Sequence, residues 1–86
     1  FGIAAQVHDP IAPAEDAKRE YGISLIDMPA LRQADAIVLA VAHGDYARGG
    51  WPMIERLLKP GGGIVLDVKG VLDRAAQPAR VELWRL

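Results

Sequence analysis

Apolar residues gather in short runs that are separated by polar or amphipathic stretches. Residues 36–42 form the longest uninterrupted run, and shorter runs occupy residues 3–7, 23–26, 64–68 and 81–86. A run without polar alternation is typical of a parallel strand that is buried on both faces. The pattern therefore predicts a series of short strands, with residues 36–42 as a central strand.

The stretches between these runs carry helical signals. Pro13 suits a first helical turn and Gly22 suits a helix end, so a helix is predicted over residues 13–21. Its apolar face is formed by Ala14, Ala17 and Tyr21. A brief helical turn is predicted over residues 29–34. A second amphipathic helix follows residue 44 and ends before the glycines at 61–63, with an apolar side formed by Trp51, Ile54, Leu57 and Leu58.

The order β-α-β-α-β-α-β up to residue 68, with a final strand at 81–86, predicts a Rossmann-like α/β fold, an open parallel sheet with helices on both faces. Such sheets usually begin with a strand-helix unit that places the first strand centrally, and nothing precedes the first run here. The chain also starts at Phe1, inside an apolar stretch and without an initiator methionine. We therefore expect residues 1–86 to form one domain that lacks its first β-α unit.

Composition excludes several classes of function. The 10 basic and 11 acidic residues give a net charge of −1, with no basic stripe that favours nucleic acid. The absence of cysteine excludes a disulfide, a thiolate metal site and a cysteine nucleophile within these residues. The longest apolar run is too short to span a bilayer, so no membrane partner and a cytoplasmic location are expected.

Candidate chemistry lies where the predicted strands end, because ligands of open parallel sheets bind beyond the carboxyl ends of the strands. These ends carry His8, Asp9, Asp27, His43, Asp45 and Lys69. Lys69 follows the strand at 64–68, and Gly70 beside it leaves room for a ligand. A lysine in this place is able to hold a phosphate as a point charge. The alternative is a solvated lysine that pairs with Asp67 or Asp73.

His43 and Asp9 each have a functional and a structural interpretation. His43 ends the run at 36–42, where it either bonds a ligand or a neighbouring subunit, or anchors the next loop through backbone carbonyls. The second interpretation is favoured. With only His8 as a further histidine, no metal site is expected. Asp9 is either the ribose-binding acid of a dinucleotide site or, because Pro10 follows, part of an Asx-Pro turn.

The glycines at 61–63 do not form a phosphate-binding fingerprint. That fingerprint requires a strand, then glycines, then a helix, whereas here a helix precedes and a strand follows. No Walker motif and no serine-centred nucleophile elbow occurs. The spacing of the candidate residues alone therefore does not indicate a particular reaction.

Five short sequence segments together resemble one protein family. They are VHDPIA at 7–12, EYG at 20–22, ADAIVLAVAH at 34–43, LDVKGVLDR at 66–74 and LWRL at 83–86. Their order and spacing resemble the C-terminal, UDP-binding domain of the UDP-glucose/GDP-mannose dehydrogenase family. Within that family, the chain is most similar to the UDP-N-acetylhexosamine branch, which serves capsule and O-antigen synthesis. A strand phrase of the Gly-Leu-Thr-Phe-Lys type, usual at the start of that domain, is absent.

The resemblance implies a specific activity. Such enzymes oxidise the C6 alcohol of a UDP-sugar to a carboxylate in two steps and consume two NAD⁺. The N-terminal domain holds NAD, a catalytic cysteine forms a thioester, and the C-terminal domain binds the UDP portion. The full enzyme is expected to be a homo-oligomer. Because it has no cysteine, the chain alone is expected to be inactive and to contain no catalytic residue. The resemblance implies that NAD is bound by the N-terminal domain and not by this chain.

The resemblance also implies residue roles. In the UDP-glucose branch, a basic residue two positions after the aspartate of the penultimate strand contacts the substrate. Lys69 stands at that place after Asp67, with lysine instead of arginine. His43 matches a histidine of the family's strand-end motif, without an assigned contact.

Two alternatives stay open. The first is a stand-alone flavodoxin-like or receiver-like module that binds a partner protein, although a receiver needs an acidic cluster at its first strand, which is absent here. The second is the NAD-binding Rossmann half itself, with Asp9 as the ribose ligand.

Overall fold

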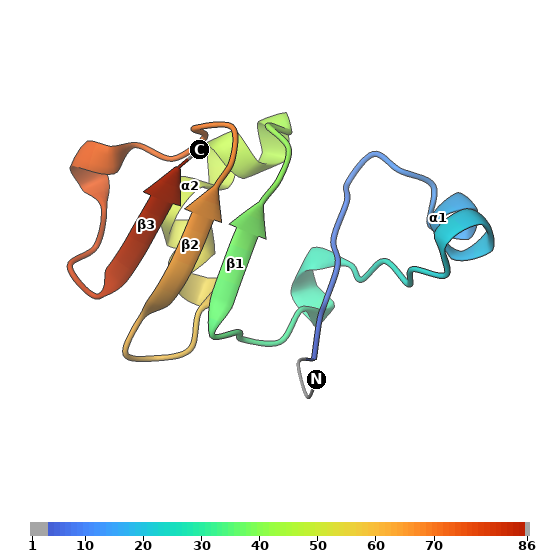
Figure 1. Ribbon diagram of the computed structural model, residues 1–86, viewed down its shortest axis with the longest axis horizontal. Helices are drawn as coiled ribbons and strands as arrows, with labels where there is room; N and C mark the ends of the chain where they lie inside the picture. The colour runs from blue at the N-terminus through green and yellow to red at the C-terminus, as the bar shows by residue number, and fades with distance from the viewer. Residues whose placement is uncertain (1–3, 86) are drawn as a thin grey trace. The chain divides into compact units, whose positions relative to one another are not determined.

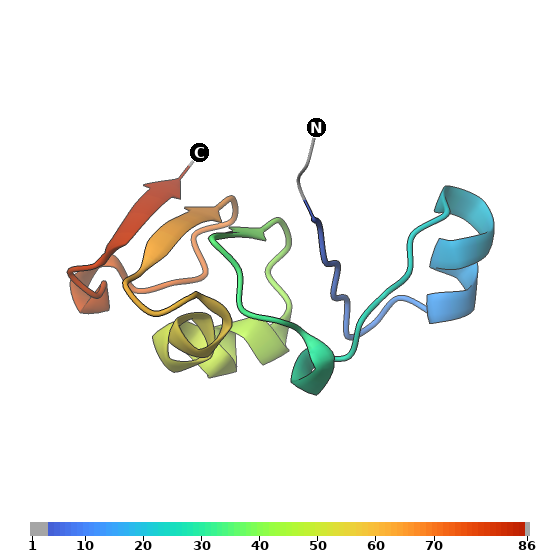
Figure 2. The ribbon, with the colours of Figure 1, turned by 90° about the horizontal axis from the view of Figure 1, so that it is seen from below.

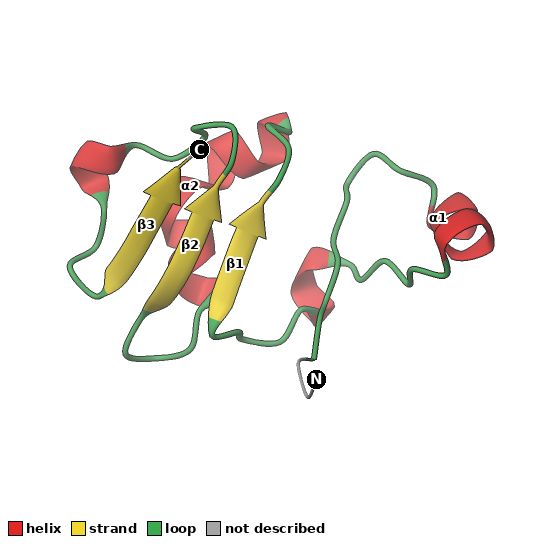
Figure 3. Cartoon of the chain, viewed as in Figure 1, coloured by secondary structure: helices red, strands yellow, loops and turns green. Residues whose placement is uncertain are grey.

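The computed structural model of the chain describes residues 4–85, which fall into two compact units that divide after Arg32. The first unit contains helix α1 (Ala14–Tyr21) and the 3₁₀ turn η1 (Met28–Ala30). The second contains β1 (Ala36–Leu39), α2 (Gly44–Leu57), β2 (Gly63–Asp67), the 3₁₀ turn η2 (Arg74–Ala76) and β3 (Val81–Arg85). Figure 1 labels the main elements, and Figure 3 separates helices, strands and loops by colour.

The first unit confirms the predicted helix but forms little of the predicted sheet. Gly22 ends α1 in the left-handed conformation, with φ 67°, as its position predicts. No residue of α1 is buried, so the predicted apolar face does not form a core. The strands expected over 3–7 and 23–26 reduce to one parallel bridge between Val7 and Leu25, and residue 3 lies outside the described part. An isolated strand pair is marginal in water, which explains why the ladder does not extend.

The second unit is a three-stranded parallel sheet in the order β1-β2-β3. Figure 2 shows α2 packed along one face of this sheet. The buried apolar side chains of the described chain all belong to this unit, and they are Leu39, Tyr46, Trp51, Met53, Ile54, Leu58, Val65, Leu72, Val81 and Leu83. This arrangement confirms the predicted Rossmann-like α/β class.

The opposite face of the sheet is apolar but exposed within this unit. Strand register aligns Val38 with Leu66 and Trp84. Val38 is 62% exposed, Trp84 57% and Ile64 48%. The strand predicted at 36–42 is shorter than expected and lies at the edge of the sheet, not at its centre. An unbroken apolar run sends side chains to both faces, but α2 covers only one of them.

Helix α2 has the predicted apolar side but contains a break. Gly50 has φ 53° and ψ −150°, and Pro52 follows without a backbone N–H, so two helical segments meet there. After the break, Trp51, Ile54 and Leu58 are buried against the sheet. The Trp51 indole donates a hydrogen bond to the Asp73 carbonyl at 2.7 Å. This bond ties the helix to the segment between β2 and β3.

Candidate functional site at the carboxyl end of the sheet

The three strands point the same way, so their carboxyl ends meet on one side of the second unit (Figure 1). This side, called the carboxyl end here, consists of residues 40–43 after β1, residues 68–72 after β2, and Arg85 at the end of β3. It contains both predicted site residues, Lys69 and His43. The structure therefore places the two candidates in the segments that follow two neighbouring strands, at the side where open parallel sheets bind ligands.

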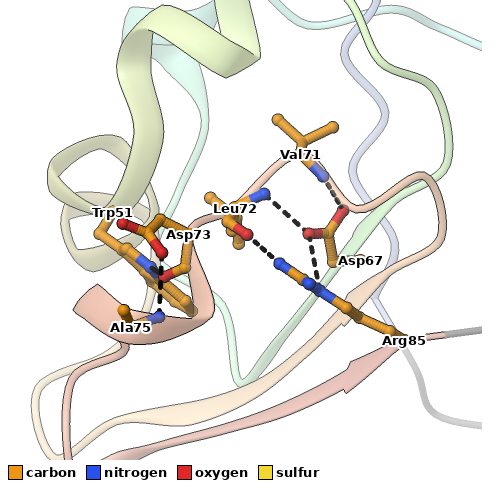
Figure 4. Close-up of polar contacts among 7 residues, drawn as sticks. All are labelled: Trp51, Asp67, Val71, Leu72, Asp73, Ala75 and Arg85. Carbon is orange, nitrogen blue, oxygen red and sulfur yellow. Dashed lines mark hydrogen bonds and ion pairs between the residues drawn. The ribbon is translucent and has the colours of Figure 1, made fainter.

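The turn after β2 is organised by the carboxylate of Asp67, which is fully buried at 0% exposure. Asp67 Oδ1 accepts a hydrogen bond from the Val71 N–H at 2.9 Å, and Oδ2 accepts one from the Leu72 N–H at 2.8 Å (Figure 4). Both carboxylate oxygens are thus engaged by the backbone of the same turn. Hydrogen bonds to an ionised acceptor are about twice as strong as neutral ones, so the turn has a defined shape.

Arg85 completes this arrangement from β3. Its Nε lies 3.7 Å from Asp67 Oδ2, and its guanidinium donates to the Leu72 carbonyl. The Arg85 side chain is 33% exposed. Burial of a carboxylate is tolerated when the charge is paired and its oxygens are hydrogen-bonded, and Asp67 meets both conditions.

Lys69 lies at the exposed tip of this turn. The preceding residue is fixed to the sheet, because the Val68 N–H donates to the Leu39 carbonyl at 3.0 Å. The following residue, Gly70, has φ 69°, and no atom lies within 4 Å of the place where a Cβ would stand. The space beside the lysine is therefore open, as the sequence predicts.

The expected structural alternative for Lys69 is not found. The Asp67 carboxylate is occupied as described, and Asp73 Oδ1 instead accepts from the Ala75 N–H at 3.0 Å, where it caps η2. Within residues 4–85, no hydrogen bond or ion pair involves the Lys69 ammonium. Its charge is therefore available to an anion from solution.

His43 stands at the start of α2, half-buried. Its carbonyl accepts hydrogen bonds from the N–H groups of Tyr46 at 3.0 Å and Ala47 at 3.2 Å. Its ring packs edge-on against the Tyr46 ring, with centroids 5.5 Å apart. These contacts place His43 at the helix start through its backbone carbonyl and its ring packing, and the predicted bond from its side chain to a backbone carbonyl stays a prediction.

Asp9 belongs to the first unit and forms a local turn. Its Oδ1 accepts hydrogen bonds from the N–H groups of Ile11 at 2.9 Å and Ala12 at 3.0 Å. This is the geometry of an Asx turn around Pro10. The structure thus supports the turn interpretation of Asp9.

The first unit has a shallow depression lined by Ala14, Glu15, Lys18, Arg19, Ser24 and Leu25, none of which is a predicted site residue. No group of three or more histidine, aspartate or glutamate side chains within residues 4–85 is placed to hold a metal ion. Across the same residues, no helix combines the length and apolarity needed to cross a membrane.

Sequence reasoning missed the pairing of Asp67 with Arg85. It treated Asp67 only as a possible neighbour of Lys69. The available signal was the charge itself, because an acidic residue that ends an apolar strand is rarely buried unless it is paired. The partner was not identifiable from spacing, since 18 positions separate the two residues and only the β2–β3 register brings them together.

A parallel α/β sheet with an unpaired cation on a turn at its carboxyl end fits the class of Rossmann-like domains, which bind ligands at that side. Comparison with known families narrows this class. A family model described as "UDP-glucose/GDP-mannose dehydrogenase family, UDP binding domain" matches residues 1–74 of the chain. The chain belongs to this family and corresponds to its UDP-binding domain. The match does not favour a stand-alone interaction module or the NAD-binding half.

Two curated relatives are similar to the chain. Protein CapL of Staphylococcus aureus is 34% identical over 86 residues, which are 100% of this chain and 20% of the relative. UDP-N-acetyl-D-glucosamine 6-dehydrogenase of Pseudomonas aeruginosa is 36% identical over 81 residues, which are 94% of this chain and 19% of the relative. The chain thus spans about a fifth of the length of these relatives. No solved structure matches it significantly.

Proposed function

We propose that the chain binds the UDP portion of a UDP-sugar for a nucleotide-sugar 6-dehydrogenase, with Lys69 contacting the diphosphate. The observation that carries this proposal is the unpaired, exposed ammonium of Lys69 above a carboxylate that is fully engaged elsewhere. A lysine is a compact point charge that suits a phosphate oxygen. The family match supports UDP as the ligand.

His43 is proposed as a second contact. It lies at the carboxyl end after β1, the strand next to the one that leads to Lys69. An imidazole at this position is able to hydrogen-bond a hydroxyl or phosphate oxygen of the substrate. The Tyr46 ring packs edge-on beside it.

The oxidation itself requires groups that this chain does not contain. There is no cysteine for a thioester, and no strand-glycine-helix fingerprint that fits NAD. The full-length enzyme we propose therefore places the cysteine and the NAD site in other parts of the protein. NAD would accept the hydride from the sugar C6, while this domain holds the nucleotide in place.

The name of one relative supports a narrower substrate. One is a UDP-N-acetyl-D-glucosamine 6-dehydrogenase, and the other is the protein CapL. On this basis the proposed substrate is a UDP-N-acetylhexosamine, oxidised to a uronic acid for a capsule or O-antigen polysaccharide. The proposed enzyme is cytoplasmic, since its two substrates, UDP-sugars and NAD, are cytoplasmic metabolites. It is also proposed to be a homo-oligomer, as the family resemblance implies.

The proposal is tested by calorimetric titration of the full-length protein with UDP. Lys69→Met removes the cation but keeps the length of the side chain. We expect it to weaken UDP binding about tenfold, the loss typical of one charge-assisted hydrogen bond. Lys59→Met is the matched control, because it removes the same charge at the other end of the sheet, where Lys59 pairs with Asp35. Equal UDP affinity of Lys69→Met and Lys59→Met would contradict the proposal.

A further inference from the structure

The turn that presents Lys69 is held at both of its ends. At its start, Val68 is bonded to the Leu39 carbonyl of β1. At its finish, the Leu72 peptide is held on both sides: its N–H donates to Asp67, and its carbonyl accepts from Arg85. The Leu72 side chain is 2% exposed and anchors the same point in the core. Only Lys69 and Gly70 are left outside these contacts.

The arrangement also controls the charge beneath Lys69. A buried carboxylate near the lysine would oppose an incoming anion if its charge were unbalanced. The Arg85 guanidinium, 3.7 Å from Asp67 Oδ2, provides the opposite charge. The pair is therefore neutral overall, and the positive charge of Lys69 is left for the ligand. One arginine thus has two roles. Its Nε faces Asp67 and balances the charge, and its terminal nitrogen donates to the Leu72 carbonyl and holds the shape of the turn.

We propose that Asp67 and Arg85 are positioning residues, which act on the nucleotide through Lys69 and do not touch it. Asp67 fixes the turn through the N–H groups of Val71 and Leu72, and Arg85 fixes the Leu72 carbonyl and balances the Asp67 charge (Figure 4). A cation on a pre-shaped turn loses less conformational freedom when it binds, which increases its affinity. This inference rests on the proposed contact between Lys69 and the UDP diphosphate.

The test is a double-mutant cycle on UDP affinity, measured by calorimetry with the full-length protein. Asp67→Asn keeps the shape of the side chain but replaces one acceptor oxygen by a donor, and Arg85→Gln removes the balancing charge. Each is expected to weaken UDP binding about fivefold in the wild-type background, somewhat less than Lys69→Met itself. In the Lys69→Met background, each is expected to change UDP affinity less than twofold, because the residue through which they act is gone.

A merely structural role gives a different result. If Asp67→Asn and Arg85→Gln weaken UDP binding by the same factor with and without Lys69, they do not act through the lysine and the inference is overturned. Arg80→Gln is the matched control for Arg85→Gln. Arg80 is exposed and precedes β3 at the other end of the sheet, so its loss should leave UDP affinity unchanged.

The outcomes separate this inference from the proposed function. If Lys69→Met does not weaken UDP binding, the proposed function fails and the positioning role fails with it. If Lys69→Met weakens binding but Asp67→Asn and Arg85→Gln do not, only the positioning role fails. If Asp67→Asn does not fold, Arg85→Gln decides the question alone, because its partly exposed side chain is the more tolerant site.

Discussion

The two ends of the parallel sheet carry the same kinds of residue but use them differently. Each end presents an exposed lysine beside a glycine turn and an aspartate. At the amino end, Lys59 Nζ lies 3.3 Å from the exposed Asp35 carboxylate and is paired with it. At the carboxyl end, the Asp67 carboxylate is buried below the turn, and Lys69 has no partner among residues 4–85.

The glycines differ in the same way. A Cβ on Gly62, at the amino end, would stand 2.0 Å from the Arg80 carbonyl oxygen, and one on Gly63 would stand 2.5 Å from the Asp35 carbonyl oxygen. A Cβ on Gly70, at the carboxyl end, would meet no atom within 4 Å. The amino end is therefore closed by its own backbone at Gly62 and Gly63, though not at Gly61, and the carboxyl end is open at Gly70. Asp35 pairs with Lys59, whereas Asp67 is bonded to the backbone of its own turn and does not pair with Lys69. Lys69 is therefore the lysine that is available to a ligand.

The largest effect is expected at the closed end. Gly62→Ala places a methyl group against the Arg80 carbonyl and forces a residue with a side chain to adopt φ 97°. The free energy of unfolding should fall by about 3 kcal/mol or more, because the backbone at Arg80 must move and the new alanine must also adopt a strained φ. Urea denaturation of the variant measures this loss. A loss below about 1 kcal/mol would show that this end is not closely packed.

Removal of the buried carboxylate comes next. Asp67→Ala leaves the N–H groups of Val71 and Leu72 without their acceptors and leaves Arg85 without its counter-ion. A loss of about 2–3 kcal/mol in unfolding free energy is expected, since unsatisfied buried donors are costly and the arginine retains some access to water. Hydrogen exchange should accelerate at Val71 and Leu72 first. Unchanged exchange at these amides would argue against the role of Asp67 in the turn.

A smaller effect is expected at the open end. Gly70→Ala meets no neighbouring atom, so only the positive φ of 69° opposes it. The cost should be about 1 kcal/mol, well below that of Gly62→Ala. Thermal unfolding of the two variants side by side checks the difference. Equal costs would mean that the two turns are not as different as their surroundings indicate.

The smallest effect is expected for the exposed ion pair at the amino end. Asp35→Asn removes the partner of Lys59, and both side chains are more than half exposed. The unfolding free energy should change by less than about 0.5 kcal/mol, as is usual for exposed pairs. Chemical denaturation at low and high salt measures it. A change above about 1 kcal/mol, or a strong dependence on salt, would show that the pair contributes more than its exposure suggests.

The elements that were predicted well are those whose signals are local. Pro13 and Gly22 delimit α1 within one residue, because capping depends only on the residues at the helix ends. The strands β2 and β3 were located by their apolar runs. The carboxyl-end position of Lys69 followed from the same alternation of strands and helices.

The elements that were predicted poorly depend on what surrounds them. Residues 36–42 have the composition of a central strand, yet composition does not determine how many strands and helices cover a run. The break in α2 is an exception, because Gly50 and Pro52 are a local signal for it that the sequence interpretation passed over. The burial of Asp67 depends on Arg85, which only the fold brings near. Local pattern thus indicated where the site lies but not what holds its shape.

The central claim is that Lys69 receives the phosphates of the nucleotide. The most direct test is calorimetric titration of the full-length protein and its Lys69→Met variant with uridine, UMP and UDP. The account predicts that Lys69→Met leaves uridine affinity unchanged and weakens UDP binding about tenfold, so that the gain in affinity from uridine to UDP shrinks. An equal loss for uridine and UDP, or no loss for either, would contradict it.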